Sequence, residues 1–363
     1  MKRNDFFYVI LFFITSGLTL ISCGDNDDPD IEPELTVTHG AYILNSGLWG
    51  ANSSSLDFFD IEKKAVNENV YKTQNGRDLG DTANDMLIYG SKIYIAVNVS
   101  NTIEVTDLTG KLIQTIVPTN DGSKIAGPRY LAAHRGKVYV SLLDGFVARI
   151  DTTNLYIETK VEVGVGADEM YVEGDKLYTS ISSYPPYKSS KVKEIDLLTF
   201  SLTKEYDVID NPTNIYVDRS GYMYVLSAGV EPDFSNKLVR FDPKTGEKKE
   251  LISNGKVTFT AYKDHLYVIS TKTENWNPVE TKFLRYNLTT QSFETEQFVS
   301  SDVVIKNSAY VDIEPSTGDA YILTGYTIET GDLYIVSKEG KLINKVGLSS
   351  ANPVCTRFVT IEQ

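Results

Sequence analysis

Residues 130–141, with the sequence YLAAHRGKVYVS, contain the pattern that decides the fold. Two short runs rich in apolar residues, 130–133 and 138–140, flank the turn residues Arg135-Gly136, and Tyr139 lies at the centre of the second run. Short apolar runs separated by a tight turn that contains glycine predict a β-hairpin. The stretch therefore predicts two paired strands, the second with a central tyrosine.

This tyrosine strand recurs seven times along the chain, at intervals of 39 to 54 residues. A partner strand and a tight turn precede six of the seven copies, as they do in residues 130–141. Self-similarity at such a period indicates a fold built from one structural unit per repeat. The seven central tyrosines are Tyr42, Tyr94, Tyr139, Tyr178, Tyr224, Tyr267 and Tyr321.

Two further strands follow each tyrosine strand. The third strand usually ends in an acid, such as Asp242, and a turn such as residues 243–246 leads to a polar fourth strand, here residues 248–252. Four strands per unit, with the outermost strand the most polar, are typical of a β-propeller blade. The sequence predicts an all-β, seven-bladed β-propeller with no helix of useful length.

The two ends of the repeat array predict how the ring closes. The first tyrosine strand has no partner strand before it, whereas a surplus strand, residues 354–361, follows the last unit. We expect this C-terminal strand to become the innermost strand of the first blade, because closure removes the exposed edges of an open array. A pair of packed sheets would not explain seven copies at one spacing.

The N-terminal residues indicate export and anchoring. Lys2 and Arg3 precede an apolar run at 6–20, which is shorter than a membrane span and typical of a signal peptide. Residues 20–23, LISC, resemble the lipobox of bacterial lipoproteins. That resemblance implies removal of residues 1–22 and a lipid on Cys23, and thus an outer-membrane protein that faces the cell exterior. The alternative is a plain signal peptide that happens to end at a cysteine.

Residues 23–38 predict an acidic, extended tether in front of a propeller at 39–363, because a dense run of like charges with two prolines does not fold alone. The acids after Cys23 also resemble the surface-export signal of Bacteroidota lipoproteins. A calcium loop, the alternative for these aspartates, would need a turn glycine and a closing glutamate. The formal charge of -14 argues against a nucleic-acid partner. With Cys23 lipidated, Cys355 has no disulfide partner and is expected to be a buried thiol.

Long, irregular loops are predicted at one end of the propeller, which we call the long-loop face. Loops within a compact domain that are this long are often functional. They span residues 45–55, 182–189, 228–236, 271–280 and 326–331 within blades, and residues 75–82, 119–128 and 301–307 between blades. Aromatic residues among Asn and Ser are typical of a recognition surface, although each could instead pack its own loop. The aromatic residues in these loops are Trp49, Tyr184, Tyr187, Phe234, Trp276 and Tyr326.

Polar residues are predicted at the entries to the innermost strands, near the central channel. They are Arg77, Asn84, Arg129, Asp168, Glu169, Asn214 and Arg357. Three arginines would suit a phosphate, a carboxylate or an amide-rich ligand. Equally, they would pair with Asp78, Asp81, Asp168 and Glu169 and tie the blades together, and the sequence does not separate these two interpretations.

The three histidines do not support catalysis. His39 opens the first strand, and His134 and His265 border hairpin turns, so all three are predicted away from the long-loop face. Neither a nucleophile–His–acid set nor a histidine-rich metal cluster can be assembled there. We expect a protein that is not an enzyme and that has no cofactor or bound metal.

Residues 20–363 resemble the YncE-like propeller lipoproteins of gut Bacteroidota. The most family-like stretch is 40–56, GAYILNSGLWGANSSSL, in which Asn45, Trp49 and Asn52 match the Asn-x-Gly-x-Trp-Gly-x-Asn loop of that group. Its best-understood members, the BtuG proteins, capture vitamin B12 at the cell surface and pass it to a TonB-dependent outer-membrane transporter. The resemblance implies a cobalamin ligand and a BtuB-like transporter as partner. A glycan-binding protein and a structural or adhesive surface protein are the alternatives.

Overall fold

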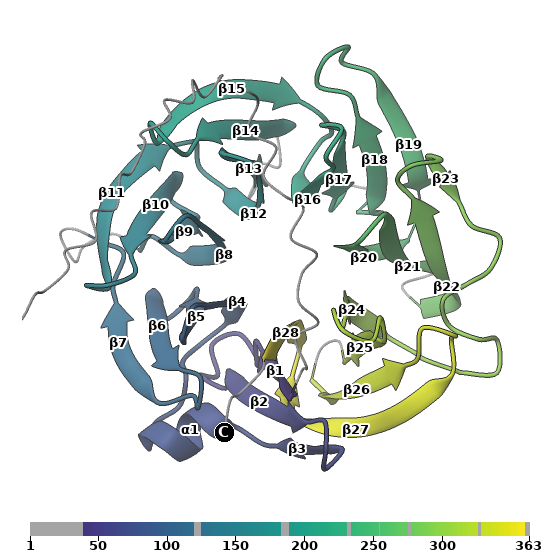
Figure 1. Ribbon diagram of the computed structural model, residues 1–363, viewed down its shortest axis with the longest axis horizontal. Coiled ribbons are helices and arrows are strands. Elements are labelled where there is room, and N and C mark those ends of the chain that lie inside the picture. The colour runs from purple at the N-terminus through teal and green to yellow at the C-terminus, as the bar shows by residue number, and fades with distance from the viewer. Residues whose placement is uncertain are drawn as a thin grey trace, which may run out of the picture. The chain divides into compact units, whose positions relative to one another are not determined.

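The computed structural model describes residues 39–119, 125–182, 189–230, 234–253, 255–274, 277–325 and 328–359. Within these ranges the chain forms seven antiparallel sheets of four strands each, which stand around a central channel as the blades of a propeller (Figure 1). The prediction of an all-β, seven-bladed propeller is confirmed. The predicted signal peptide, the tether and Cys23 lie outside the described residues.

The first blade combines both ends of the described chain. From the innermost strand outward it contains β28 (Pro353–Val359), β1 (Gly40–Asn45), β2 (Ser55–Asp60) and β3 (Ala65–Asn67). In the pairing of β1 with β28, Tyr42 lies opposite Arg357 and Leu44 opposite Cys355. The C-terminal strand therefore closes the ring as predicted, and the first blade gains the partner strand that its own repeat lacks.

Each of the other six blades uses four consecutive strands, the first of which lines the channel (Figure 1). The second blade contains β4 (Ala83–Tyr89), β5 (Lys92–Val97), β6 (Thr102–Asp107) and β7 (Leu112–Ile116), and the third contains β8 (Pro128–His134), β9 (Lys137–Leu142), β10 (Phe146–Asp151) and β11 (Tyr156–Glu162). The fourth blade contains β12 (Ala167–Glu173), β13 (Lys176–Ile181), β14 (Lys191–Asp196) and β15 (Ser201–Asp207), and the fifth contains β16 (Pro212–Val217), β17 (Met223–Ser227), β18 (Lys237–Phe241) and β19 (Lys248–Ser253). The sixth blade contains β20 (Lys256–Tyr262), β21 (His265–Glu274), β22 (Asn277–Asn287) and β23 (Ser292–Phe293), and the seventh contains β24 (Ser308–Ile313), β25 (Ala320–Thr324), β26 (Thr330–Val336) and β27 (Leu342–Ala351).

The hairpin of residues 130–141 shows how the local sequence produces its turn. His134 pairs with Lys137, so only Arg135 and Gly136 connect β8 to β9. Both have positive φ values, 44° and 77° respectively. Two consecutive residues with positive φ give a turn whose twist matches that of the flanking strands, and glycine adopts this conformation at little cost.

The hydrophobic core consists of seven clusters, one at each interface between neighbouring blades. Each of the seven repeat tyrosines packs in or against one of these clusters, and six of them are buried. In the first blade the hydroxyl of Tyr42 also donates to the carbonyl of Leu108 in the second blade, at 2.5 Å. The tyrosine that marks each repeat in the sequence thus joins its blade to a neighbour.

The acids at the ends of the third strands have a structural role. Asp151, for example, accepts hydrogen bonds from the backbone amides of Thr153 and Asn154 in the turn that follows. These bonds and Lys137 lower the pKa of Asp151 to about 2. Asp60, Asp107, Asp196, Asp242, Asn287 and Ser337 accept turn amides in the same way. The repeated acid therefore stabilises a turn.

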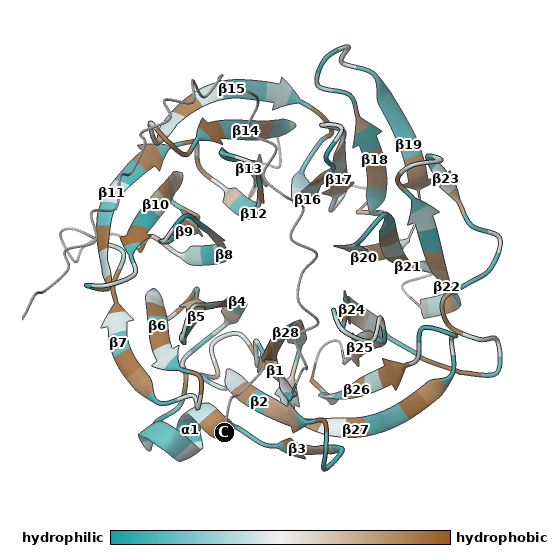
Figure 2. Cartoon of the chain, viewed as in Figure 1, coloured by the Kyte–Doolittle hydropathy of each residue, from teal (hydrophilic) through white to brown (hydrophobic). Residues whose placement is uncertain are grey.

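Two expectations are wrong in detail. A short helix, α1 (Val70–Asn75), capped by Asn69, lies between the first and second blades and overlaps the start of the predicted loop 75–82. Within 271–280, predicted as a loop, β21 continues to Glu274 and β22 begins at Asn277. The outermost strand β19 is mostly hydrophilic (Figure 2), as expected, whereas the outermost strand β7 is not. In the described residues, no helix is long and apolar enough to cross a membrane.

Candidate functional site

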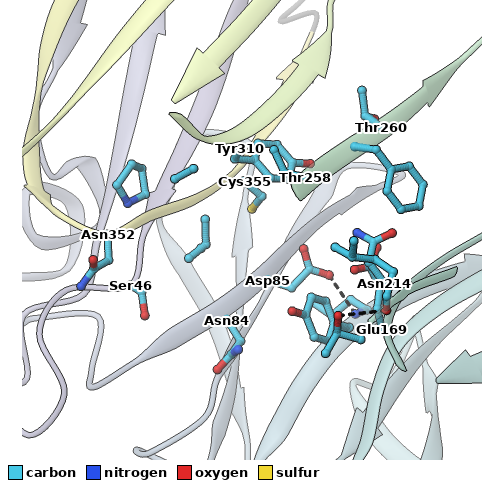
Figure 3. Close-up of a pocket in the computed structure, with 18 of the residues that line it drawn as sticks. Ser46, Asn84, Asp85, Glu169, Asn214, Thr258, Thr260, Tyr310, Asn352 and Cys355 are labelled. Carbon is cyan, nitrogen blue, oxygen red and sulfur yellow. Dashed lines mark hydrogen bonds between the residues drawn. The ribbon is translucent and has the colours of Figure 1, made fainter. Parts of the chain in front are cut away.

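The channel contains a cavity of about 860 Å³, which we call the central cavity. Side chains from the innermost strands of all seven blades line it, and Figure 3 shows several of them converging on one space. Ser46, Trp49, Thr82 and Asn352, from loops of the long-loop face, also line the cavity. The central cavity therefore opens on the face where long loops are predicted.

The strand register arranges the lining in two layers. The inner layer consists of the residues opposite the seven repeat tyrosines. Four of them, Tyr171, Tyr216, Thr260 and Arg357, line the cavity, and the other three, Leu87, Ala132 and Asp312, are not among its lining residues. Two residues earlier on each strand, and so nearer the long-loop face, is the outer layer: Asp85, Tyr130, Glu169, Asn214, Thr258, Tyr310 and Cys355. Residues two apart on a strand point to the same side, so each blade contributes one side chain to each layer.

Irregular pairing accompanies the outer layer. In six of the seven blades the register between the innermost strand and its partner shifts at or just before this position, and only β20 pairs regularly throughout. Such β-bulges often occur beside functional sites, because the extra residue re-aims a side chain. The outer layer is therefore the level at which the blades depart most from a regular sheet.

One side of the cavity is charged and internally paired. Arg357 donates to Asp85 at 2.8 Å and to the Tyr310 hydroxyl at 3.1 Å, and lies 3.7 Å from Asp312. Asp85 also accepts the backbone amide of Leu131 at 2.9 Å. Burial raises the pKa of Asp85 and raises that of Asp312 to about 6, while Arg357 opposes both shifts. This network joins the third, second, first and seventh blades.

The other two arginines are also engaged inside the protein. Arg129 donates twice to Asp168, at 3.2 and 2.9 Å, and so ties the third blade to the fourth. Arg77 donates to Glu104 at 2.8 Å, which places it against the outer strands of the second blade and not at the channel as predicted. The contacts therefore support the blade-tying interpretation for Arg129 and Arg357, although Arg357 uses a different acid from those expected, whereas Arg77 pairs with the second blade alone.

The fourth, fifth and sixth blades give the cavity an aromatic side. Tyr171 and Tyr216 lie edge to face with ring centroids 4.9 Å apart, and Phe259 adds a third ring to the lining. Tyr171 and Tyr216 are half-buried, so part of each ring faces the open space. Aromatic side chains in edge-to-face contact offer a large apolar contact area with fixed orientation.

Polar groups without protein partners lie above these rings. Glu169 and Asn214 precede Tyr171 and Tyr216 by two residues on β12 and β16. Among the described residues, no hydrogen bond or ion pair reaches the Glu169 carboxylate, and burial together with Asp85 and Asp168 raises its pKa well above the usual range. The Asn84 Oδ1 atom is buried and likewise has no hydrogen-bond partner there. The predicted residues Asn84 and Asn214, and also Glu169, therefore lie together around one opening.

Trp49 stands at the rim and is 82% exposed. Its loop, residues 46–54, is held in place by Asn352, whose backbone carbonyl accepts the amide of Ser46 at 2.8 Å and whose side chain donates to the carbonyl of Gly47 at 2.9 Å. The amide of Gly50 donates to Asp81. These hydrogen bonds fix the backbone of the loop, so a ligand that contacted Trp49 would not have to order the loop first.

The remaining predicted residues lie elsewhere or outside the described ranges. Asn45 is fully buried and donates to Ser55 and Asp57, so its side chain does not reach the cavity. Asn52 is exposed on the rim loop with a φ of 51°, a conformation that asparagine tolerates, and it does not line the cavity. Tyr184, Tyr187, Trp276 and Tyr326 lie outside the described residues.

Sequence reasoning missed three residues that organise the site. Asp85 and Tyr310 follow directly from the repeat, because they occupy the outer-layer position of their strands, two residues before the one opposite the tyrosine. Asp57 is buried and accepts hydrogen bonds from Asn45 and from the backbone amide and hydroxyl of Ser349, which joins the first and seventh blades. Residues 45–57 carry no local signal for that contact. In the described part of the chain, no group of three or more His, Cys, Asp and Glu side chains is placed to hold a metal ion.

The family model of a domain of unknown function, DUF5074, matches residues 39–345. No curated protein matches the chain. Among solved structures, a quinonprotein alcohol dehydrogenase-like protein of Bacteroides thetaiotaomicron is similar at a TM-score of 0.62 and 18% identity, over 88% of this chain and 78% of that one. Hydrazine synthase of Kuenenia stuttgartiensis is similar at a TM-score of 0.57 and 13% identity, over 72% of this chain and 85% of that one. A dihydro-heme d1 dehydrogenase is similar at a TM-score of 0.56 and 12% identity, over 91% of this chain and 77% of that one. At these identities the likeness shows the β-propeller fold alone.

Proposed function

Because the chain belongs to the DUF5074 family, whose function is unknown, its function has to be argued from the site, and we propose that it captures a small ligand at the long-loop face. The observation that carries this proposal is the central cavity, with unpartnered polar groups above an aromatic floor and Trp49 at its rim. A concave site that combines aromatic walls with a few convergent polar groups is the usual form of a ligand pocket.

The chemistry of the lining favours a ligand rich in amides. Arg357, the one arginine of the lining, already donates to Asp85 and Tyr310, so it offers little to a phosphate or a carboxylate. Glu169 and Asn214 instead present acceptors to the open space, and amide groups are their natural donors. Together with the resemblance to the vitamin B12-capturing propellers, this makes a corrinoid such as cobalamin the ligand that we propose. A corrinoid exceeds the cavity in size and would cover its mouth.

The rim supports a second part of the proposal, transfer to a partner. Sixteen large apolar side chains are exposed in the described residues. Ten of them lie on loops or strand ends of the long-loop face: Leu48, Trp49, Val99, Val117, Ile125, Val165, Phe234, Val279, Val304 and Ile328. Exposed apolar groups gathered on one face are typical of a protein-interaction surface. We propose that this face docks on a TonB-dependent outer-membrane transporter, and that lipid on Cys23 holds the protein at the membrane.

Gel filtration with cyanocobalamin tests the ligand. The soluble Cys23→Ala form of the chain is mixed with cyanocobalamin at micromolar concentration, and the corrin absorbance is followed through the column. We expect co-elution, and a dissociation constant that rises at least about thirtyfold with Trp49→Ala, because an aromatic anchor that the ligand covers is worth about 2 kcal/mol. His134→Ala, at a hairpin turn away from this face, serves as the control and should bind normally.

Two outcomes would change the proposal. If no corrin absorbance travels with the protein, the corrinoid is the wrong ligand. Exposed aromatic side chains beside amides also stack on sugar rings, so a glycan screen is the next step in that case. If cyanocobalamin co-elutes equally with wild type and Trp49→Ala but not with His134→Ala, the ligand is correct and the long-loop face is not its site.

A further inference from the structure

Among the described residues, Glu169 is the one charged side chain of the cavity lining that has no partner of opposite charge. Within the described residues, Asp85 pairs with Arg357 at 2.8 Å, and the neighbouring Asp168 pairs with Arg129 at 2.9 Å. Asp312, behind Arg357, shares that guanidinium at 3.7 Å. Both arginines near the lumen are thereby used, and the Glu169 carboxylate is left facing the opening without a partner (Figure 3). A carboxyl group in this setting is costly to ionise unless a positive or hydrogen-bond-donating group reaches it.

The strand geometry places Glu169 directly above an aromatic surface. Glu169 and Tyr171 point to the same side of β12, and Asn214 and Tyr216 repeat the same order on the neighbouring strand β16. The two tyrosine rings contact each other, with centroids 4.9 Å apart. Two adjacent blades therefore present one polar level near the mouth and one aromatic level beneath it.

We propose that this part of the cavity is a subsite for a flat ring that carries a cationic or hydrogen-bond-donating group, with the ring against Tyr171 and Tyr216 and the donor on Glu169. The inference rests on the proposed ligand-capture function and adds the chemical class that the cavity selects. An anionic group on the same ring is disfavoured, because it cannot neutralise an ionised Glu169 and the guanidinium of Arg357 is already occupied by Asp85 and Tyr310. A cationic group favours the ionised carboxylate of Glu169, whereas an anionic group opposes its ionisation.

Three small probes of the same shape test the head-group preference. Benzamidine, benzamide and benzoate share one ring and differ in a cationic, a neutral and an anionic substituent. Equilibrium binding to the soluble Cys23→Ala chain is measured by ligand-observed NMR at millimolar probe concentration. We expect benzamidine to bind at least tenfold more tightly than benzoate, with benzamide between them. Benzoate binding as tightly as benzamidine, or no binding of any probe, would overturn the subsite.

Variants then test the two levels. Glu169→Gln should weaken benzamidine at least tenfold and change benzamide by less than about threefold, because it removes the charge and keeps the shape. Glu173→Gln, the same change on the same strand but outside the cavity lining, is the matched control. Tyr216→Leu should weaken all three probes alike. Equal effects of Glu169→Gln and Glu173→Gln would overturn the role of Glu169, and thermal melts establish that each variant is folded.

The probes also separate this inference from the corrinoid proposal. Selective binding of benzamidine without any binding of cyanocobalamin would leave the subsite standing and remove the corrinoid. If cyanocobalamin binds equally to wild type and Glu169→Gln, and the ring probes show no head-group preference, the corrinoid proposal stands and the subsite is wrong.

Discussion

Arg357 and Asp85 lie 272 residues apart in the chain, and their side chains meet at 2.8 Å at the centre of the propeller. Arg357 belongs to β28, the strand that closes the ring, and Asp85 belongs to the first strand of the second blade. Asp85 also accepts the backbone amide of Leu131 in the third blade, and Arg357 also donates to the Tyr310 hydroxyl in the seventh. The closing strand is thus held by hydrogen bonds within its own sheet and also by a polar network that crosses blade interfaces.

Replacement of Arg357 should therefore destabilise the fold. Arg357→Met leaves the buried Asp85 carboxylate without its positive partner, a loss of about 3 kcal/mol in free energy of unfolding for a pair of this kind. Urea denaturation followed by circular dichroism measures it. Arg135→Met removes an exposed pair with Asp175 and should cost less than about 1 kcal/mol. Equal losses in the two variants would contradict the special role of Arg357.

Removal of the closing strand should have a larger effect. A chain that ends at Asn352 lacks β28, so β1 loses its inner partner and the cluster that contains Cys355 and Val359 loses buried apolar area. We expect this truncated form to aggregate or to lose its cooperative thermal transition, because an open ring exposes two unpaired sheet edges. Unchanged cooperative melting of the truncated form would argue against closure as a requirement for folding.

Asp312 should make stability depend on pH in one narrow range. Burial raises its pKa to about 6 in the folded state, from 3.8 in the exposed chain. The folded state then holds this proton more tightly, so the contribution of Asp312 is complete below about pH 4 and is lost as the pH rises through 6. The aspartates of the turns, such as Asp151 with its pKa of about 2, act in the opposite sense and at lower pH.

The difference between wild type and Asp312→Asn isolates this contribution. The unfolding free energy of the Asp312→Asn variant should change less between pH 4 and pH 7 than that of wild type, whatever the absolute stability of the variant. Chemical denaturation at half-unit pH steps provides the measurement, and the exposed Asp302→Asn is the control. Parallel pH profiles for wild type and Asp312→Asn would show that another group is responsible.

The repeat made the fold predictable, whereas the chemistry of the channel was only partly so. The seven tyrosines gave blade number, strand order and ring closure, because each lies in a strand that packs at a blade interface. Asn84 and Asn214 were identified from their place at the entries to innermost strands. Arg77 was predicted at the channel, but it follows α1 and donates to Glu104, away from the channel. Neither the helix nor this contact could be predicted from the sequence pattern. Pairing of Arg129 with Asp168 depends on how two blades meet, which spacing alone does not specify.

Gly47 offers a test of whether the rim loop must be rigid to hold Trp49. Gly47 has a φ of 74°, and a β-carbon there would lie 2.5 Å from the backbone carbon of Ser53, so Gly47→Ala must displace the loop. Gly50 has a similar φ of 78° but nothing within 4 Å of the added carbon. Gly50→Ala therefore costs only the strain of the left-handed conformation, roughly 1 kcal/mol, and is the matched control.

In a Trp276→Phe background, which leaves Trp49 as the only tryptophan, we expect Gly47→Ala to lower the anisotropy of the tryptophan fluorescence. We also expect it to weaken cyanocobalamin binding at least tenfold, whereas Gly50→Ala changes affinity by less than about threefold. The physical reason is that a loop which samples several positions must be ordered when the ligand binds, and that cost is subtracted from the affinity. The fluorescence measurement needs no ligand, so it tests the loop even if the corrinoid is wrong. Indistinguishable fluorescence of the two variants would mean that the contacts of Asn352 and Asp81, and not the close approach of Gly47 to Ser53, fix the position of Trp49.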